Sequence, residues 1–154
     1  IKGEERTFTI GKYSHNAPII NGNAQTKRLA EIVELSDNHV KLDLSLCYEL
    51  CKGSVFRTFD LCGKGLTVKD EFYGMDVSEI EYAFTLSEKG NVRVEDGVLV
   101  MDFEDFTSKM KASFDFYAKE IISPSGIIEK SRIIHKMKIE NKEEISFKVW
   151  VQDV

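Results

Sequence analysis

The sequence predicts an all-β fold, an antiparallel β-sandwich of about ten to twelve strands. Three observations support this prediction. Apolar and polar residues alternate in short segments, turn residues separate these segments at a spacing of roughly 8–12 residues, and no segment has a convincing helical period. Only two prolines are present. A regular series of short strands of this kind is typical of sandwiches and barrels.

Four strands are expected in the first half of the chain. The clearest is residues 39–47, where Val40, Leu42, Leu44 and Leu46 point to one face and polar residues to the other. The other three are expected at residues 27–35, 55–60 and 66–72, with turns at 36–38 and 62–65.

The second half continues the same pattern. Residues 80–86 alternate in strict period two, with Ile80, Tyr82 and Phe84 on one face. Asp96-Gly97 is the strongest hairpin signal, because both central positions of such a turn favour positive φ. The strands around it are expected at residues 91–95 and 98–103, and later ones at 106–111, 113–117, 127–139 and 144–151, the last two joined by a turn at 140–142. In the final strand the residues expected to face inward are Ile145, Phe147, Val149 and Val151.

Length and charge limit the possible partners. The 154 residues suit a single domain, residues 1–154, with a substantial core. The net charge of −5 comes from interspersed acidic and basic residues, which argues against nucleic-acid binding. No apolar run approaches the roughly 18 residues that span a membrane. The chain begins at Ile1 and has no signal peptide, so we expect a fragment or a processed product.

Three cysteines are present, Cys47, Cys51 and Cys62, and none is spaced as a zinc ligand pair. We expect buried, reduced thiols, because a free cysteine behaves as a small hydrophobic residue. The sequence leaves open a bridge from Cys62 to Cys47 or to Cys51.

Histidine is the residue type most able to carry chemistry here, and the chain has three. His39 is expected to be a solvent-facing turn residue, and His135 a half-exposed strand residue. His15 precedes the apolar pair Ile19-Ile20 and the turn Asn21-Gly22, which places it at a rigid strand edge suited to a ligand. One histidine does not make a zinc centre, which needs three or four ligands.

The segment around His15 carries a motif. It matches the pattern His-Asn-x-x-x-x-(Asn/Asp)-Gly-x-x-Gln at His15, Asn16, Asn21, Gly22 and Gln25. This segment resembles the signature that opens the C-terminal β-sandwich of heparinase II/III-like polysaccharide lyases.

The resemblance extends further along the chain. An arginine strand (residues 54–59), a turn, and a strand with a Leu-x-Val-x-Asp pattern (residues 65–72) are similar to the same family. Arg57 and Asp70 are expected to pair across neighbouring strands and to fix their register. The resemblance covers residues 8–72, and beyond residue 75 only strand periodicity is shared.

The resemblance implies a parent protein in which an α-helical toroid precedes the sandwich. Such lyases cleave uronic-acid polysaccharides, including heparin, heparan sulfate and alginate, by β-elimination. By resemblance, His15 is one metal ligand, and zinc is expected in the full-length parent but not in this chain alone. The catalytic residues would lie upstream, so none is assigned here. The partners are then the parent's own N-terminal toroid and an acidic polysaccharide, with no nucleic acid and no membrane. The parent's localisation is left open between secretion and the periplasm.

A different class of function is a non-catalytic carbohydrate-binding or scaffolding module. Sandwiches bind sugars through exposed aromatic residues, and Trp150, the only tryptophan, lies out of phase with the inward Val149 and Val151. The aromatic cluster of Phe114, Phe116 and Tyr117 is expected in the core. Nothing supports a stand-alone hydrolase, because the chain has no Gly-x-Ser-x-Gly elbow.

Overall fold

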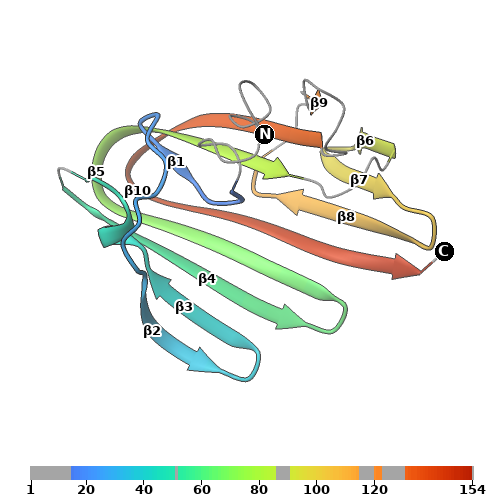
Figure 1. The fold of residues 1–154 in the computed structure, drawn as a ribbon, viewed down its shortest axis with the longest axis horizontal. Coiled ribbons are helices and arrows are strands. Elements are labelled where there is room, and N and C mark those ends of the chain that lie inside the picture. The colour runs from blue at the N-terminus through green and yellow to red at the C-terminus, as the bar shows by residue number, and fades with distance from the viewer. Residues whose placement is uncertain (1–14, 51, 86–90, 115–119, 123–130, 154) are drawn as a thin grey trace.

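The computed structural model describes residues 15–50, 52–85, 91–114, 120–122 and 131–153 (Figure 1). Its ten strands are β1 Ile19–Ile20, β2 Glu31–Ser36, β3 His39–Asp43, β4 Ser54–Cys62, β5 Gly65–Thr85, β6 Asn91–Glu95, β7 Val98–Asp102, β8 Phe106–Ala112, β9 Glu120–Ile122 and β10 Ser131–Asp153. The single helical element among the described residues is a short 3-10 turn, η1 Ser45–Cys47. The predicted all-β sandwich is confirmed, with a strand number inside the predicted range.

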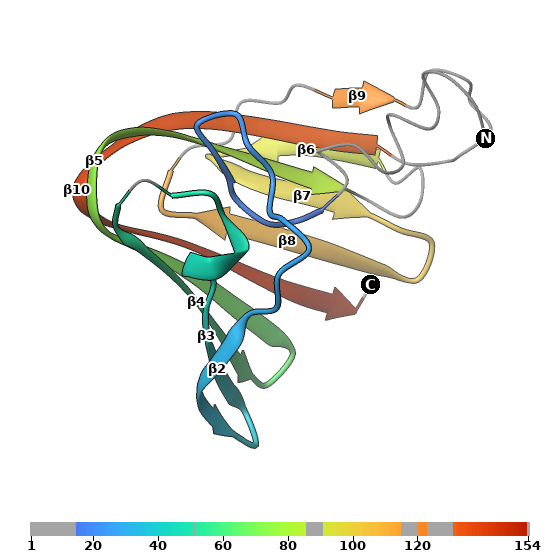
Figure 2. The ribbon, with the colours of Figure 1, turned by 60° about the vertical axis from the view of Figure 1, so that its left-hand side comes forward.

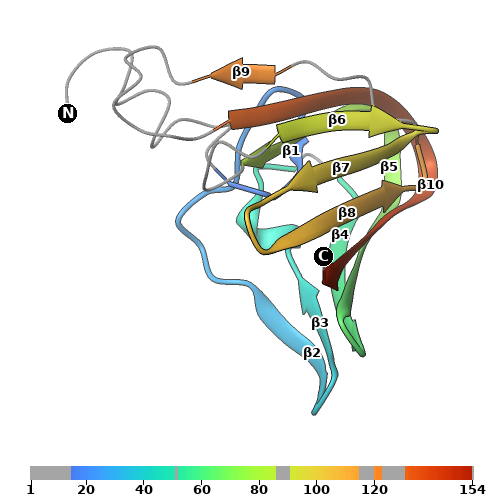
Figure 3. The ribbon, with the colours of Figure 1, turned by 90° about the vertical axis from the view of Figure 1, so that its right-hand side faces the viewer.

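All strand pairings are antiparallel, and the strands follow the order β2-β3-β4-β5-β10-β8-β7-β6, with β1 added to β5 and β9 to β10. The two long strands, β5 and β10, bend together so that each runs through both layers (Figures 2 and 3). One layer holds β2, β3, β4, β8, β7, β6 and one half of each long strand. The other layer holds β1, β9 and the remaining halves.

The bend is where the sequence prediction was wrong. Residues 66–72 and 80–86 were expected as separate strands, but 66–72 and 80–85 belong to the one strand β5, and residues 140–142 lie within β10 rather than forming a turn. Gly74, at φ 66°, supplies the backbone conformation that lets β5 bend. Register shifts on both sides of Asn141 let β10 follow the bend while the pairing continues.

The expected turns at residues 36–38, 62–65 and 96–97 are present. Asp96 and Gly97 have φ values of 48° and 73°, as the hairpin between β6 and β7 requires. The expected strand at residues 39–47 is shorter, because β3 ends at Asp43, whose carboxylate accepts a 2.8 Å hydrogen bond from the Ser45 N–H. Leu46, expected on the same face as Leu44, is therefore 62% exposed, whereas Leu44 is buried.

The core lies between the two layers and is rich in aromatic residues. Tyr82, Phe84 and Phe147 are nearly inaccessible and pack on one another with ring centroids 5.4–6.1 Å apart. Phe114 stacks on Tyr82, as expected for a core residue, although it follows β8 outside any strand. Phe116 and Tyr117 lie outside the described residues.

The other predictions have mixed outcomes. In the last strand Ile145 and Phe147 are buried, but Val151, near its C-terminal end, is 37% exposed.

Cys47 is buried as expected, Cys62 is exposed, and both are free thiols, so the Cys47–Cys62 bridge is not formed. Cys51 lies outside the described residues. In the part of the chain that the structure describes, no helix has the length and apolar character needed to cross a bilayer.

Candidate functional site

The His15 segment enters the fold through β1. Residues 15–17 form a bend, and the chain then buries Ile19 and Ile20 against β5, where they pair with Glu81 and Ile80. The turn that follows is attached to the same strand by Asn21. Its N–H donates to the Glu79 carbonyl at 2.7 Å, and its side-chain oxygen accepts the Glu79 N–H at 2.9 Å. The motif asparagine therefore fixes the turn to the sheet.

Two buried side chains hold the main chain just before β1. The Arg57 guanidinium donates from Nη1 to the Asn16 carbonyl at 2.7 Å, and the Tyr48 hydroxyl donates to the Pro18 carbonyl at 2.7 Å. Burial raises the pKa of the Tyr48 hydroxyl well above its usual value, so this donor keeps its proton. The backbone carrying His15 and Asn16 is thus anchored from β4 and from the residue after η1.

The arginine belongs to a buried network. Its Nε and Nη2 donate to the two carboxylate oxygens of Asp70, each at 2.6 Å, and the Tyr82 hydroxyl donates to the same carboxylate at 2.6 Å. Arg57 is 6% exposed, and Asp70 is fully buried. Burial opposes the arginine's charge, but the carboxylate outweighs it and raises the arginine's pKa further. The predicted pairing of Arg57 with Asp70 is confirmed.

The network fixes the positions of Arg57, Asp70 and Tyr82 and is not suited to proton transfer. Burial, together with the neighbouring Asp70 charge, raises the pKa of Tyr82 far above its usual value. The tyrosine therefore remains a donor at neutral pH. Arg57 and Tyr82 both donate to Asp70, so the buried carboxylate has the partners that a buried charge requires.

His15 and Asn16 have exposed side chains, and Gln25 is exposed as well. Among the described residues, no group of three or more His, Cys, Asp or Glu side chains is placed to hold a metal ion. His15 alone does not fit a zinc site. Its role as a ligand remains a prediction that needs donors from elsewhere.

A cavity of about 270 Å³ opens beside this segment, between the two layers. Asn16 and Arg57 form its polar side, and apolar residues such as Phe59, Phe84 and Met101 form the rest. Such a lining suits an apolar side chain from another segment better than a sugar, which needs several polar partners.

His39 was expected to be a solvent-facing turn residue, and it is instead a half-buried residue that follows the turn. It opens β3 between two carboxylates, with Nδ1 2.6 Å from Asp60 and Nε2 3.1 Å from Glu34. The hydrogen bond to Asp60, more than the one to Glu34, raises the pKa of the imidazole, against the opposing effect of burial. Pairing of residues 39 and 60 across β3 and β4 was the signal that could have found this contact. His135 lies in β10 opposite Tyr82, and its side chain is outside the described part of the chain.

Comparison with known proteins bears on the fold. No protein-family model matches the chain, and no curated protein matches it in sequence. The heparan sulfate lyase HepC from Pedobacter heparinus superposes on 100% of the chain with a TM-score of 0.72 and 11% identity. A heparinase III structure, the BT4657 gene product, also covers 100% of it, with a TM-score of 0.71 and 13% identity.

The chain has the fold of a heparinase-like β-sandwich domain. It spans only 27% and 26% of the length of those two proteins. A related sandwich occurs in an aldose 1-epimerase candidate from Escherichia coli K12, with a TM-score of 0.62 and 9% identity over 81% of this chain. At such identities the heparinase-like fold is shared, while the activity is a separate question.

Proposed function

We propose that this chain is the C-terminal β-sandwich part of a heparinase II/III-like polysaccharide lyase, inactive alone, and that it forms one wall of the cleft. The observation that carries the proposal is the anchoring of the His15–Asn16 segment by Arg57, because the segment that resembles the lyase motif is held by a buried arginine. Similarity to heparinase structures over the whole chain supports it.

The parent reaction would be β-elimination on a uronic-acid polysaccharide. A base removes the proton at C5, the carboxylate-stabilised charge is neutralised, and an acid protonates the departing oxygen. Tyr48 and Tyr82 do not suit either proton transfer, because both are buried donors with raised pKa values. We therefore assign no catalytic residue to this chain. The base and the acid would come from the toroid.

The β2–β3 hairpin supports a larger parent. Ile32 and Leu35 are 59% and 72% exposed, although they lie on the inner face, paired with Leu42 and Val40. Figure 3 shows β2 and β3 projecting away from the rest of the strands. An apolar inner face left uncovered is typical of an interface. In the proposal, the toroid of the parent packs there.

A deletion and a single substitution test the role of this chain. We expect lyase activity from the longer parent, none from the 154-residue chain, and none from the parent lacking it. His15→Ala in the parent should lower kcat/KM, whereas the matched control His39→Ala should leave it unchanged. Full activity in the His15→Ala parent, or in the parent without this domain, would contradict the proposal.

A second candidate is a non-catalytic carbohydrate-binding module. It is favoured by one observation, that Trp150 lines an open groove on the outer face of the sheet. Saturable binding of an oligosaccharide by the 154-residue chain, without any lyase activity in the parent, would support this candidate over the first.

A further inference from the structure

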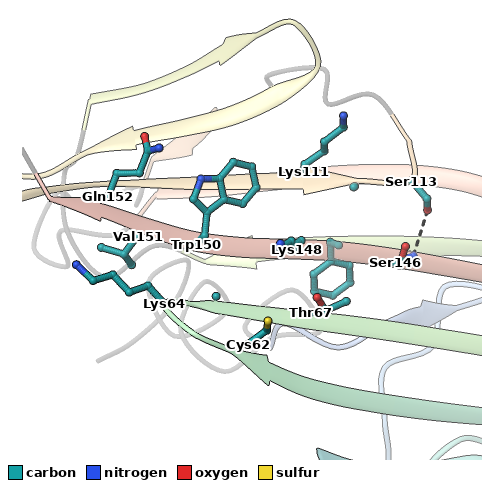
Figure 4. Close-up of a pocket in the computed structure, with 13 residues that line it drawn as sticks. Cys62, Lys64, Thr67, Lys111, Ser113, Ser146, Lys148, Trp150, Val151 and Gln152 are labelled. Carbon is teal, nitrogen blue, oxygen red and sulfur yellow. Dashed lines mark hydrogen bonds between the residues drawn. The ribbon is translucent and has the colours of Figure 1, made fainter. Parts of the chain in front are cut away.

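A groove of about 680 Å³ runs across the outer face of the sheet, over β5, β10 and β8 (Figure 4). Trp150 stands in its middle, with Lys111 and Lys148 on one side and Gln152 on the other. Lys64 reaches it from the turn between β4 and β5. The groove faces away from the core, because Lys148 and Trp150 alternate with the inward Phe147 and Val149 along β10.

The indole of Trp150 has an accessible face on its β5 side, because its neighbour there is a glycine, while its neighbour on β8 is Lys109. Trp150 pairs with Gly65 on β5, which has no side chain to cover the ring. A Cβ added at Gly65 would lie 3.3 Å from the Val149 carbonyl and 3.6 Å from Lys148 Cε, so a larger residue would be crowded at this position. A flat, half-exposed aromatic ring beside a glycine is a stacking platform for the apolar face of a sugar ring.

The positive charges of Lys111 and Lys148 repel each other across the strand pair, and a bound anion would relieve this repulsion. Lys148 lies directly opposite Lys111 across β10 and β8, and like charges opposite each other destabilise a sheet. Among the described residues no carboxylate lines the groove, and neither amine has a carboxylate within ion-pair distance. The cross-strand row that contains the two lysines meets an acidic residue two strands away on each side: Asp60, which is engaged by His39, and Glu95, which is engaged by Arg93. In a chain of net charge −5, this groove is a local concentration of positive charge.

We propose that the groove binds an acidic oligosaccharide, with one pyranose ring stacked on Trp150 and its carboxylate or sulfate groups between Lys111 and Lys148. Gln152 and the Ser113 hydroxyl supply hydrogen bonds to sugar hydroxyls. This site is separate from the His15–Asn16 segment, which lies on the inner side of the sheet. It would hold a polymer outside the cleft, and it does not depend on the parent being a lyase.

Trp150 is the only tryptophan, so its fluorescence reports on this groove alone. Titrating the 154-residue chain with a heparan sulfate hexasaccharide should change the emission saturably, and the affinity should fall as salt is raised, because ion pairs are screened. The neutral control, cellohexaose, should bind at least about tenfold more weakly. An equal response to both sugars, or no response to the acidic one, would overturn the proposal.

Charge-removing variants keep the reporter in place. Lys148→Gln and Lys111→Gln should each weaken binding about threefold or more, and together about tenfold, as expected for charge contacts at a surface. Lys138→Gln, an exposed lysine elsewhere on β10, is the matched control and should bind as wild type. Undiminished affinity in the double variant would place the saccharide elsewhere and reject the site. The titration requires no turnover, so failure of the lyase proposal would leave its result unaffected.

Discussion

The Arg57 guanidinium and the Asp70 carboxylate form two parallel hydrogen bonds, each 2.6 Å long, between β4 and β5. The third contact of the same guanidinium, to the Asn16 carbonyl, leaves the sheet and holds the motif segment. A bidentate pair of this kind has a geometry that lysine cannot reproduce. One buried ion pair therefore connects the sheet register to the candidate site.

Arg57→Met should strongly destabilise the chain. It leaves the Asp70 carboxylate buried without its cationic partner, which costs about 3–5 kcal/mol in free energy of unfolding. Urea denaturation followed by circular dichroism measures this loss in the free energy of unfolding. The matched control is Arg93→Met, whose side chain is 40% exposed and pairs with Glu95 at the surface, and it should change stability far less. A loss below about 1 kcal/mol for Arg57→Met would contradict the buried pair.

Arg57→Lys separates the two functions of the arginine. One ammonium can pair with Asp70 but does not present the fork that also reaches the Asn16 carbonyl. Hydrogen exchange of the amides at residues 16–20 should therefore accelerate, while those of β4 stay protected. Unchanged exchange in the segment would show that Arg57 does not hold it.

Tyr82→Phe should destabilise the chain by about 1–3 kcal/mol, because the Asp70 carboxylate loses a buried donor. The hydroxyl donates at 2.6 Å from a fully buried ring. Tyr73→Phe is the control, since its hydroxyl donates to Glu71 in a partly exposed position, and it should cost less. Equal losses of thermal stability in the two variants would argue against the special position of Tyr82.

His39 should make the stability of the β2–β3–β4 region depend on pH. Its pKa is raised in the folded chain above an ordinary value of about 6.5, so its stabilising contribution is complete below that value. The contribution is lost as the pH rises through the raised pKa. Thermal melts across this range should show a larger decline for wild type than for His39→Gln. Parallel declines in both proteins would exclude His39 as the source.

The 154-residue chain should bind zinc poorly, worse than about micromolar, because a single imidazole gives little chelation. Calorimetric titration with zinc measures this. His15→Ala should leave the melting temperature of the chain almost unchanged, since the residue is exposed. Tight, stoichiometric zinc that disappears in His15→Ala would contradict the account, because it would mean that this chain supplies the other ligands.

The parts of the fold that local pattern controls were predictable from the sequence. The Asp96-Gly97 hairpin and the face shared by Val55, Arg57, Val68 and Asp70 follow from turn chemistry and strict alternation. The continuity of β5 and β10 was not predictable from the sequence. In the sequence alone, Gly74 and Asn141 indicate ends of strands, and only the pairing of β5 with β10 shows that both lie in a shared bend. In the site, the Arg57–Asp70 pair was expected from the resemblance of its two strands to the lyase family. Its contact with Asn16 spans 41 positions in the sequence and needed the structure.

The central claim is that the parent cleaves an acidic polysaccharide by elimination. The most direct measurement is mass spectrometry of the products formed by the parent from heparan sulfate, alginate and chondroitin, together with their near-ultraviolet absorbance. Elimination predicts product masses that sum to the substrate mass, with one absorbing unsaturated uronate per cleavage. Products that have gained one water per cleavage and do not absorb would show hydrolysis, and no product from any polymer would contradict the lyase.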